Sequence, residues 1–255
     1  MRYAFLSDIH ANPSALERVL ADTREQGADK VICLGDIVGY GPDPVGALQL
    51  CREGCDINLM GNHDAAVAGL TDFRNFIPFA RDGVIRHRDL LTPEQRGWLG
   101  ELPYLFKTRT FYAVHGSLKD PPEFAYILYR PDARAAFSLL GRKKLLFVGH
   151  THEAMWIEER EGGEVVGHDP YSFTLQREKR YIVNVGSVGY PRILPESTYV
   201  IYDSRRKTIA YRHLPFDFKG YAKEMETRDI PLPRWLEKSL ATVPHPLGSP
   251  PETPA

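Results

Sequence analysis

Residues 2–10 read RYAFLSDIH, an apolar run that ends in Asp8 and His10. The pattern returns at residues 31–36, VICLGD, and at residues 57–64, INLMGNHD. Each run has the length and the apolar composition of a buried strand. The three runs therefore predict three strands, each followed directly by polar residues.

Helix signals follow the first two of these strands. Asn12-Pro13 comes after the first and Asp43-Pro44 after the second. Asn and Asp cap helix N-termini and proline suits the first helical turn, so both pairs predict helices. Strand–helix units repeated this closely predict parallel strands joined by right-handed crossovers.

The later sequence predicts a second sheet. Residues 65–102 have helical spacing, with a helix start at Thr92-Pro93, and residues 132–140 predict one more helix. Short turns at residues 160–163 and 203–206 predict hairpins. The β-type runs are 103–107, 110–114, 145–148, 153–158, 164–168, 181–185, 197–203 and 207–213. The expected fold class is α/β, with two packed mixed β-sheets flanked by helices in a four-layer α/β/β/α sandwich.

The chain has room for one large domain, which we expect to span residues 1–243. Further helices are expected near 217–227 and 232–241. Residues 244–255 contain five prolines and almost no apolar side chains. Such a segment buries too little surface to fold, so we expect a disordered tail.

Charge and composition limit the classes of partner. The chain has 32 Lys and Arg against 33 Asp and Glu, a net charge of −1, and so no overall basic field to hold a long nucleic acid. Three cysteines are an odd count and are expected to stay reduced. No apolar stretch is long enough for a membrane span or a signal peptide. We expect a cytoplasmic protein without a membrane partner; its oligomeric state stays open.

The polar residues at the strand ends are the candidate site. Asp8 and His10 lie two positions apart, where strand alternation would turn both to one side. His150 and His152 follow the run 145–148, and His115 follows 110–114. Each alone has an ordinary explanation: a turn or cap for Asp8, a core position for His115. Because the carboxyl ends of parallel strands meet in one crevice, their joint occurrence predicts a metal site there.

These motifs resemble the five signature blocks of the calcineurin-like metallophosphoesterase superfamily, in particular its compact bacterial phosphoesterase and phosphodiesterase branch. The blocks are Asp8-x-His10, Gly35-Asp36, Gly61-Asn62-His63-Asp64, Val114-His115-Gly116 and Gly149-His150-Thr151-His152. The segment 184–192 further resembles the closing segment of that branch. The resemblance implies a dinuclear site with the ligands Asp8, His10, Asp36 and His152 on one ion and Asp36, Asn62, His115 and His150 on the other.

The resemblance also implies the chemistry. Two divalent transition-metal ions would hold an activated water for attack on phosphorus, and His63 would stabilise charge on the leaving group or protonate it. Carboxylate, amide and imidazole ligands suit manganese, our first expectation, as well as iron, zinc, nickel or cobalt. For Asp64 we prefer a helix cap to a catalytic role. The expected substrate is a small phosphoester, with a nucleotide among the candidates.

The chain departs from some relatives at Gly39-Tyr40, where the protein phosphatases and dinucleoside tetraphosphatases carry an Asp and an Arg. The loss of that Arg removes a bidentate phosphate clamp and favours a phosphodiester over a phosphomonoester. Tyr40 and Arg192 are the candidate substrate-binding residues. Candidates to stack a nucleobase are Tyr126, Tyr129 and Tyr190. Two alternatives remain: a phosphomonoesterase acting on nucleotides or phosphoproteins, and a non-catalytic metal-binding scaffold like the retromer subunit of this fold.

Overall fold

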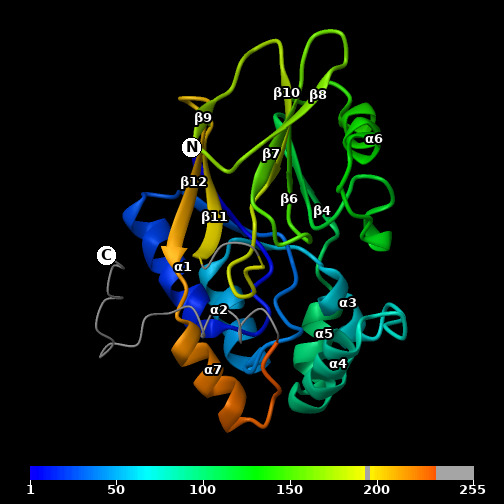
Figure 1. Cartoon of the computed structure of the whole chain (residues 1–255), viewed down its shortest axis with the longest axis vertical. Coiled ribbons are helices and arrows are strands. Elements are labelled where there is room, and N and C mark those ends of the chain that lie inside the picture. Colours follow the sequence, from blue (N-terminus) through cyan, green and yellow to red (C-terminus); the bar gives the residue numbers. More distant parts are fainter. Residues whose placement is uncertain (193–195, 234–255) are drawn as a thin grey trace, which may run out of the picture. The chain divides into compact units, whose positions relative to one another are not determined.

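A computed structural model describes residues 1–192 and 196–233 of the chain (Figure 1). Contacts between residues divide the chain into two compact units, Met1–Phe216 and Asp217–Ala255. In the second unit the described residues form helix α7, Phe218–Thr227, whose N-terminus is capped by the Asp217 side chain. Most of the helix expected at 232–241 lies outside the described residues, and so does the tail expected from residue 244.

The first sheet has the strand order β3-β2-β1-β11-β12-β9. The parallel strands are β1 (Arg2–Leu6), β2 (Lys30–Cys33) and β3 (Ile57–Asn58). The strands β11 (Glu196–Asp203), β12 (Thr208–Pro215) and β9 (Phe173–Thr174) continue the sheet in antiparallel pairs. The parallel pairing expected for the first three strands is confirmed.

The second sheet has the order β4-β5-β6-β10-β7-β8. Its central strands β5 (Phe111–Val114), β6 (Leu145–Val148) and β10 (Arg180–Asn184) are parallel. The flanking strands β4 (Leu105–Lys107), β7 (Met155–Glu159) and β8 (Val165–His168) are antiparallel. Both expected hairpins are present, β7–β8 and β11–β12.

Helices flank the sheets on both sides, as the expected sandwich requires. In Figure 1, α1 (Pro13–Glu25) and α2 (Pro44–Gly54) lie beside the first sheet and α6 (Arg130–Leu140) beside the second. The helices α3 (Asn62–Ala68), α4 (Pro78–Leu90) and α5 (Pro93–Gly100) pack together at the carboxyl end of the strands. The expected caps are present: Asn12 and Asp43 accept the amides of Ala15 and Gly46, each at 3.0 Å.

The main core lies between the sheets. Phe5 of β1 stacks on Phe147 of β6 with ring centroids 3.8 Å apart, and Phe111 of β5 meets both rings edge-on. A second core joins the outer face of the second sheet to Phe137 and its neighbours on α6. The strands on both sides of the central core are therefore fixed relative to each other, and so are the loops at their ends.

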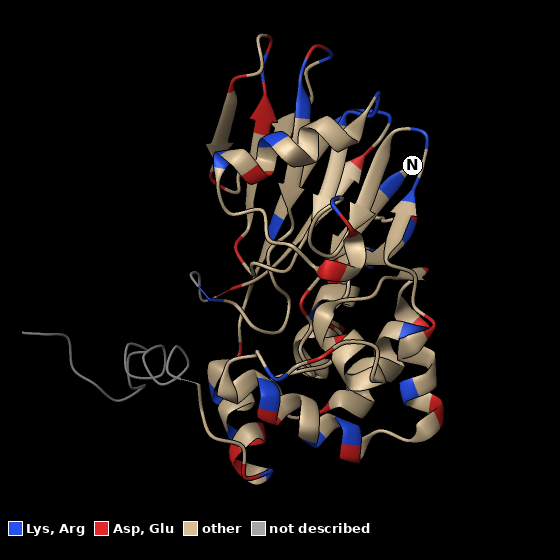
Figure 2. Cartoon of the chain, turned by 90° about the vertical axis from the view of Figure 1, so that its right-hand side faces the viewer, with Lys and Arg blue, Asp and Glu red and all other residues tan. Residues whose placement is uncertain are grey.

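The structure differs from the sequence expectations in a few elements. Strand β9 was not expected, because two residues carry no readable alternation. Helix α3 begins at Asn62 rather than at residue 65. All three cysteines are free thiols, as expected. Among the described residues no helix is long and apolar enough to cross a bilayer, and Figure 2 shows Lys and Arg interspersed with Asp and Glu.

Candidate metal centre

Loops from five strand ends meet at the carboxyl edge of the two sheets. The amide of Asp8 donates to the Gly35 carbonyl at 3.0 Å, which joins the loops after β1 and β2. The amide of His150, after β6, donates to Asp8 Oδ2 at 3.0 Å and so joins the two sheets. Gly61 approaches so closely that an added Cβ would lie 2.2 Å from the Asp36 amide nitrogen. These backbone contacts place the polar side chains of all five loops in one buried cluster.

The first part of the cluster brings together Asp8, His10 and His152. His10 Nδ1 lies 3.0 Å from the Val38 carbonyl and His152 Nδ1 lies 2.7 Å from the Tyr190 carbonyl. A carbonyl only accepts hydrogen bonds, so each Nδ1 carries the proton of the neutral ring and each Nε2 presents a lone pair.

These two lone pairs face each other without a hydrogen between them. The His10 and His152 Nε2 atoms are 3.1 Å apart, and Asp8 Oδ1 lies 3.3 Å from the Nε2 of His152. Asp8 Oδ1 is buried without a hydrogen-bond partner among the described residues. Three electron-pair donors that converge in this way repel one another unless a cation lies between them, so the residues fit a bound metal ion.

The second part of the cluster brings together Asp36, His115 and His150. Asp36 Oδ2 lies 3.3 Å from His115 Nε2, and this nitrogen lies 3.1 Å from His150 Nδ1. The Asn62 side-chain oxygen is buried without a partner among the described residues. Asp36 Oδ2 also lies 3.6 Å from His10 Nε2, so this one oxygen faces both parts of the cluster.

The backbone at these positions is strained. Five of the seven expected ligands have left-handed φ angles between 48° and 69°: Asp8, His10, Asp36, His150 and His152. Non-glycine residues rarely adopt this conformation, and it concentrates at functional sites. Asp8 and His10 therefore share a side because of the loop after β1, not because of strand alternation as the sequence analysis assumed.

Electrostatics at the cluster favour added positive charge. Burial lowers the pKa of His115, but the carboxylates of Asp36 and Asp8 outweigh it and raise that pKa to about 9. Burial lowers the pKa of His150 to about 3 and holds that of His152 well below its usual range. The last two rings thus keep their lone pairs at neutral pH.

His63 lies beside the cluster. Its amide donates to Asp36 Oδ1 at 2.9 Å, and its ring centroid is 4.9 Å from that of His10. Nδ1 packs against Gly39, where an added Cβ would lie 2.2 Å away, so only glycine leaves room for this ring. Burial lowers the pKa of His63 to about 3. The imidazole is neutral at neutral pH and presents an N–H rather than a full charge.

Tyr40 follows Gly39 and is buried in an aromatic stack. Its ring lies 4.4 Å from Tyr190 and 5.8 Å from Phe79, with nearly parallel planes, and 4.6 Å from the His63 ring. Burial raises the pKa of the Tyr40 hydroxyl, which therefore stays protonated. Tyr40 lines the cleft, but its ring also fills the space between His63 and Phe79 of α4.

Two positioning residues were not identified as such from the sequence. Asp64 caps α3 as expected, and its carboxylate also accepts the amides of Asp36, Ile37 and Val38 at 2.8–3.1 Å. The buried His87 of α4 accepts the Gly39 amide and donates to the Gly41 carbonyl, both at 2.9 Å. In the sequence, His87 stands among charged residues of a predicted helix, and such a pattern is typical of a solvent-exposed helix face.

A cleft of about 480 Å³ opens above the cluster. Its walls include Asp36, Asn62, His63, Tyr40, Tyr126 and Arg192. Tyr126 stacks on His150 with ring centroids 3.8 Å apart and is 46% exposed. Of the other two stacking candidates, Tyr190 is buried against Tyr40, and Tyr129 lines neither this cleft nor the cavity beside it.

Buried carboxylate, amide and imidazole atoms at the strand ends of two packed sheets are typical of a metal-dependent enzyme. The chain belongs to the calcineurin-like phosphoesterase superfamily, whose domain profile matches residues 1–207. An uncharacterised protein of Methanocaldococcus jannaschii is 31% identical over 243 residues, which cover 93% of this chain and 96% of that protein. The phosphodiesterase YfcE of Escherichia coli is 26% identical over 180 residues, 69% of this chain and 82% of its own length.

Solved structures agree with the family. The crystal structure of a metallophosphoesterase from Sphaerobacter thermophilus has a TM-score of 0.80 and 32% identity, covering 94% of this chain and 98% of that chain. The chain is a metal-dependent phosphoester hydrolase with the expected two-sheet fold, and the cluster supplies candidate metal-binding residues.

Proposed function

We propose that the cluster binds two divalent transition-metal ions. Asp8, His10 and His152 hold the first, and Asn62, His115 and His150 hold the second. Asp36 is shared between them. The observation that carries this proposal is Asp36 Oδ2, which lies 3.6 Å from His10 and 3.3 Å from His115. Manganese is our first candidate, since these oxygen and nitrogen ligands suit it along with iron, zinc, nickel and cobalt.

Elemental analysis of gently purified protein tests the metal content, with titration of metal-stripped protein as the second measurement. We expect saturation at two ions per chain, and an Asp36→Asn variant that binds both more weakly. The exposed α4 residue Asp89 gives a matched control, because Asp89→Asn leaves the cluster intact. Saturation of the wild type at one ion would contradict the shared-ligand assignment.

We infer that the reaction is hydrolysis of a small phosphodiester. When bound, two ions supply a nucleophilic water at neutral pH and positive charge for the phosphoryl oxygens. His63 places its neutral imidazole N–H beside the cluster, where it stabilises negative charge on the leaving group by a hydrogen bond. The low pKa of His63 favours this role over donation of a full proton. The similarity to the phosphodiesterase YfcE supports a diester.

Arg192 is the proposed phosphate-binding cation. It lines the cleft together with Tyr40. Its positive charge acts to lower the pKa of Tyr40, His150 and His152. Arg192→Gln should lower kcat/KM by about 10- to 100-fold, the worth of one charge-assisted hydrogen bond. An unchanged kcat/KM would show that Arg192 does not bind the phosphate.

Arg192 also supports the alternative that the protein is a phosphomonoesterase. Tyr40 stands where the related phosphatases carry an arginine, and the lack of that arginine argues against binding of a phosphomonoester dianion. Arg192, by contrast, offers a cation from another loop. Comparison of kcat/KM for bis(nitrophenyl) phosphate and nitrophenyl phosphate decides between them, because the leaving group is the same. We expect the diester to be the better substrate; a clear preference for the monoester would favour the phosphatase.

A further inference from the structure

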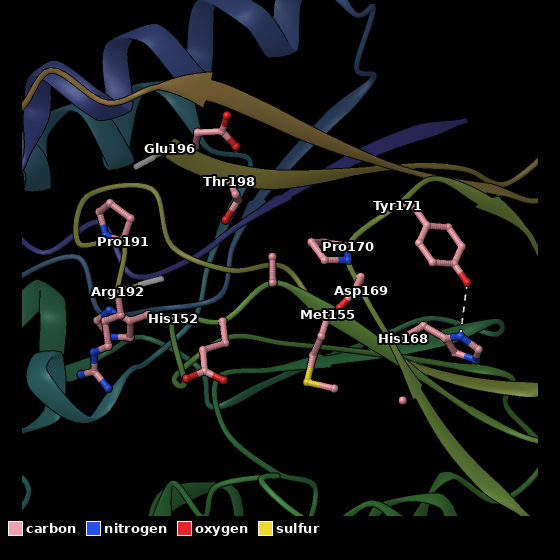
Figure 3. Close-up of a pocket in the computed structure, with 13 residues that line it drawn as sticks. His152, Met155, His168, Asp169, Pro170, Tyr171, Pro191, Arg192, Glu196 and Thr198 are labelled. Atoms are coloured by element: carbon pink, nitrogen blue, oxygen red, sulfur yellow. Dashed lines mark hydrogen bonds between the residues drawn. The ribbon is translucent and has the colours of Figure 1, made fainter. Parts of the chain in front are cut away.

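A second cavity, of about 700 Å³, adjoins the cleft (Figure 3). His152 and Arg192 line both the cleft and this cavity, so the two spaces meet at these side chains. Its described walls come from β7, β8 and β11, from residues 152–154 before β7 and 169–171 after β8, and from Pro191 and Arg192. None of the activity proposed above uses this cavity, although its volume lies in the range of pockets that enclose small organic ligands.

Carboxylates outnumber Lys and Arg among the described residues that line the cavity. Arg192 is the one Lys or Arg among the described lining residues, and it lies at the metal-cluster end beside His152 (Figure 3). The other charged side chains in the lining are the carboxylates of Glu153, Asp169 and Glu196. Glu196 has a partner, His213, with Nδ1 and Oε2 3.0 Å apart. A ligand in this cavity would therefore meet one positive side chain, Arg192, and three carboxylates among the described lining residues.

The end of the cavity away from Arg192 is aromatic. His168 stacks on the buried Trp156 with ring centroids 3.8 Å apart, and Phe173 stacks on the same Trp156 ring at 4.0 Å. The hydroxyl of Tyr171 lies 3.2 Å from His168 Nδ1. The Tyr171 ring is 52% exposed and meets Trp156 edge-on, so it offers an open face held by its neighbours.

We propose that this cavity binds the organic group of the substrate, and that this group carries an aromatic ring and no second phosphate. The proposal rests on the proposed function, because it places the phosphorus at the metal cluster and Arg192. The ester group extends from there along the cavity to the ring of Tyr171. The carboxylates exclude a further phosphate by like-charge repulsion and tolerate hydroxyl, amide or amino groups. The substrate class is therefore a phosphodiester with one nucleoside-sized, uncharged or cationic ester group.

Calorimetric binding to the manganese-loaded full chain tests the proposal without relying on turnover. The probes are thymidine 5′-phosphate and methyl phosphate, which share the phosphate and differ in the organic group. We expect thymidine 5′-phosphate to bind about tenfold more tightly, the low end of base–aromatic stacking. Tyr171→Ala should remove that difference and Tyr171→Phe should keep it.

Tyr129 provides the matched control, since it is 72% exposed and lines neither the cavity nor the cleft. Tyr129→Ala should leave both affinities unchanged. Thymidine 3′,5′-bisphosphate should bind less tightly than the 5′-phosphate, and Asp169→Asn should reduce that penalty. Equal affinities of the wild type for thymidine 5′-phosphate and methyl phosphate, or a gain from the 3′-phosphate, would overturn the proposal.

Hydrolysis of methyl trifluoroethyl phosphate separates this inference from the proposed function. Neither ester group of this diester carries an aromatic ring for the Tyr171 end of the cavity, so its turnover, followed by release of trifluoroethanol, depends on the metal cluster and not on that contact. If it is not hydrolysed and the Tyr171-dependent binding is found, the cavity proposal stands and the diesterase proposal fails. If it is hydrolysed and that binding is absent, the cavity proposal fails and the diesterase proposal stands.

Discussion

At the scale of single residues, the site depends on side chains that hold backbone rather than substrate. Asp64 accepts four amides, those of Gly61, Asp36, Ile37 and Val38, and so fixes the loop that carries the shared carboxylate. Burial and the nearby charge of Asp36 raise the pKa of Asp64 to about 7. One buried carboxylate thus determines the position of another.

The variant Asp64→Asn should destabilise the fold and weaken metal binding. The amide has one acceptor oxygen where the carboxylate has two, so two of the four buried amides lose their acceptor. We expect the free energy of unfolding to fall by about 2 kcal/mol or more, measured by urea denaturation. Asp89→Asn on the exposed face of α4 is the control. An Asp64→Asn protein with wild-type stability would show that the loop is held by other contacts.

His63 should affect turnover without affecting metal content. His63→Ala is expected to lower kcat by roughly 10²- to 10⁴-fold, the range of assistance by a positioned acid, base or donor. The defect should be smaller for nitrophenyl esters, because a leaving group of low pKa needs little stabilisation. Metal loss in this variant would make His63 a ligand, and equal defects on all esters would argue against a role at the leaving group.

At the scale of elements, a partly buried ion pair joins α1 to the first sheet. Asp22 of α1 accepts the Tyr199 hydroxyl of β11 at 2.6 Å and two Arg212 nitrogens of β12 at 2.9 and 3.0 Å. Burial raises the pKa of Asp22, but hydrogen bonds from Arg212 and Tyr199 outweigh it and lower that pKa. The helix is therefore attached to the strands by charge as well as by packing.

This cluster predicts a pH-dependent part of the stability. Because the folded-state pKa of Asp22 is lowered, its contribution is present above the unfolded value of about 4 and is lost as the pH falls through the folded value. The stability difference between the wild type and Asp22→Asn should be largest above about pH 5 and shrink in acid. Denaturation at a series of pH values measures it; a difference that does not change with pH would contradict it.

Local signals predicted most of the elements. Helices α1, α2 and α5 begin at the caps that the sequence shows, because a cap and a proline act within one turn. The seven expected metal ligands lie in one cluster, because they follow parallel strands whose ends meet at one edge. The backbone conformation of the site could not be predicted from the sequence, because the left-handed φ angles of Asp8 and His152 come from contacts between distant loops. The role of His87 likewise depends on an element far away in the sequence, the loop at Gly39 and Gly41.

At the scale of the whole molecule, we expect the metal cluster to stabilise the fold only when cations are bound. The facing lone pairs of His10 and His152, with the carboxylate of Asp8, oppose folding in the stripped protein. Chelation should therefore lower the melting temperature. At a free manganese concentration of 100 times Kd, one site adds about 2.7 kcal/mol, or roughly 5–10 °C for a chain of this size. Calorimetry with and without chelator measures the shift, and equal melting temperatures would contradict metal binding to the folded state.

The order of the ligands along the chain sets the time at which the site is completed during synthesis. The first proposed ion needs Asp8 and His10 from the beginning of the chain and His152 from a position 142 residues beyond His10. The strand–helix units up to β3 can form earlier, yet they hold only part of either ligand set. While residue 152 is still inside the ribosome, the nascent chain lacks a complete site. We therefore expect metal capture to be a late event that accompanies closure of the second sheet onto the first.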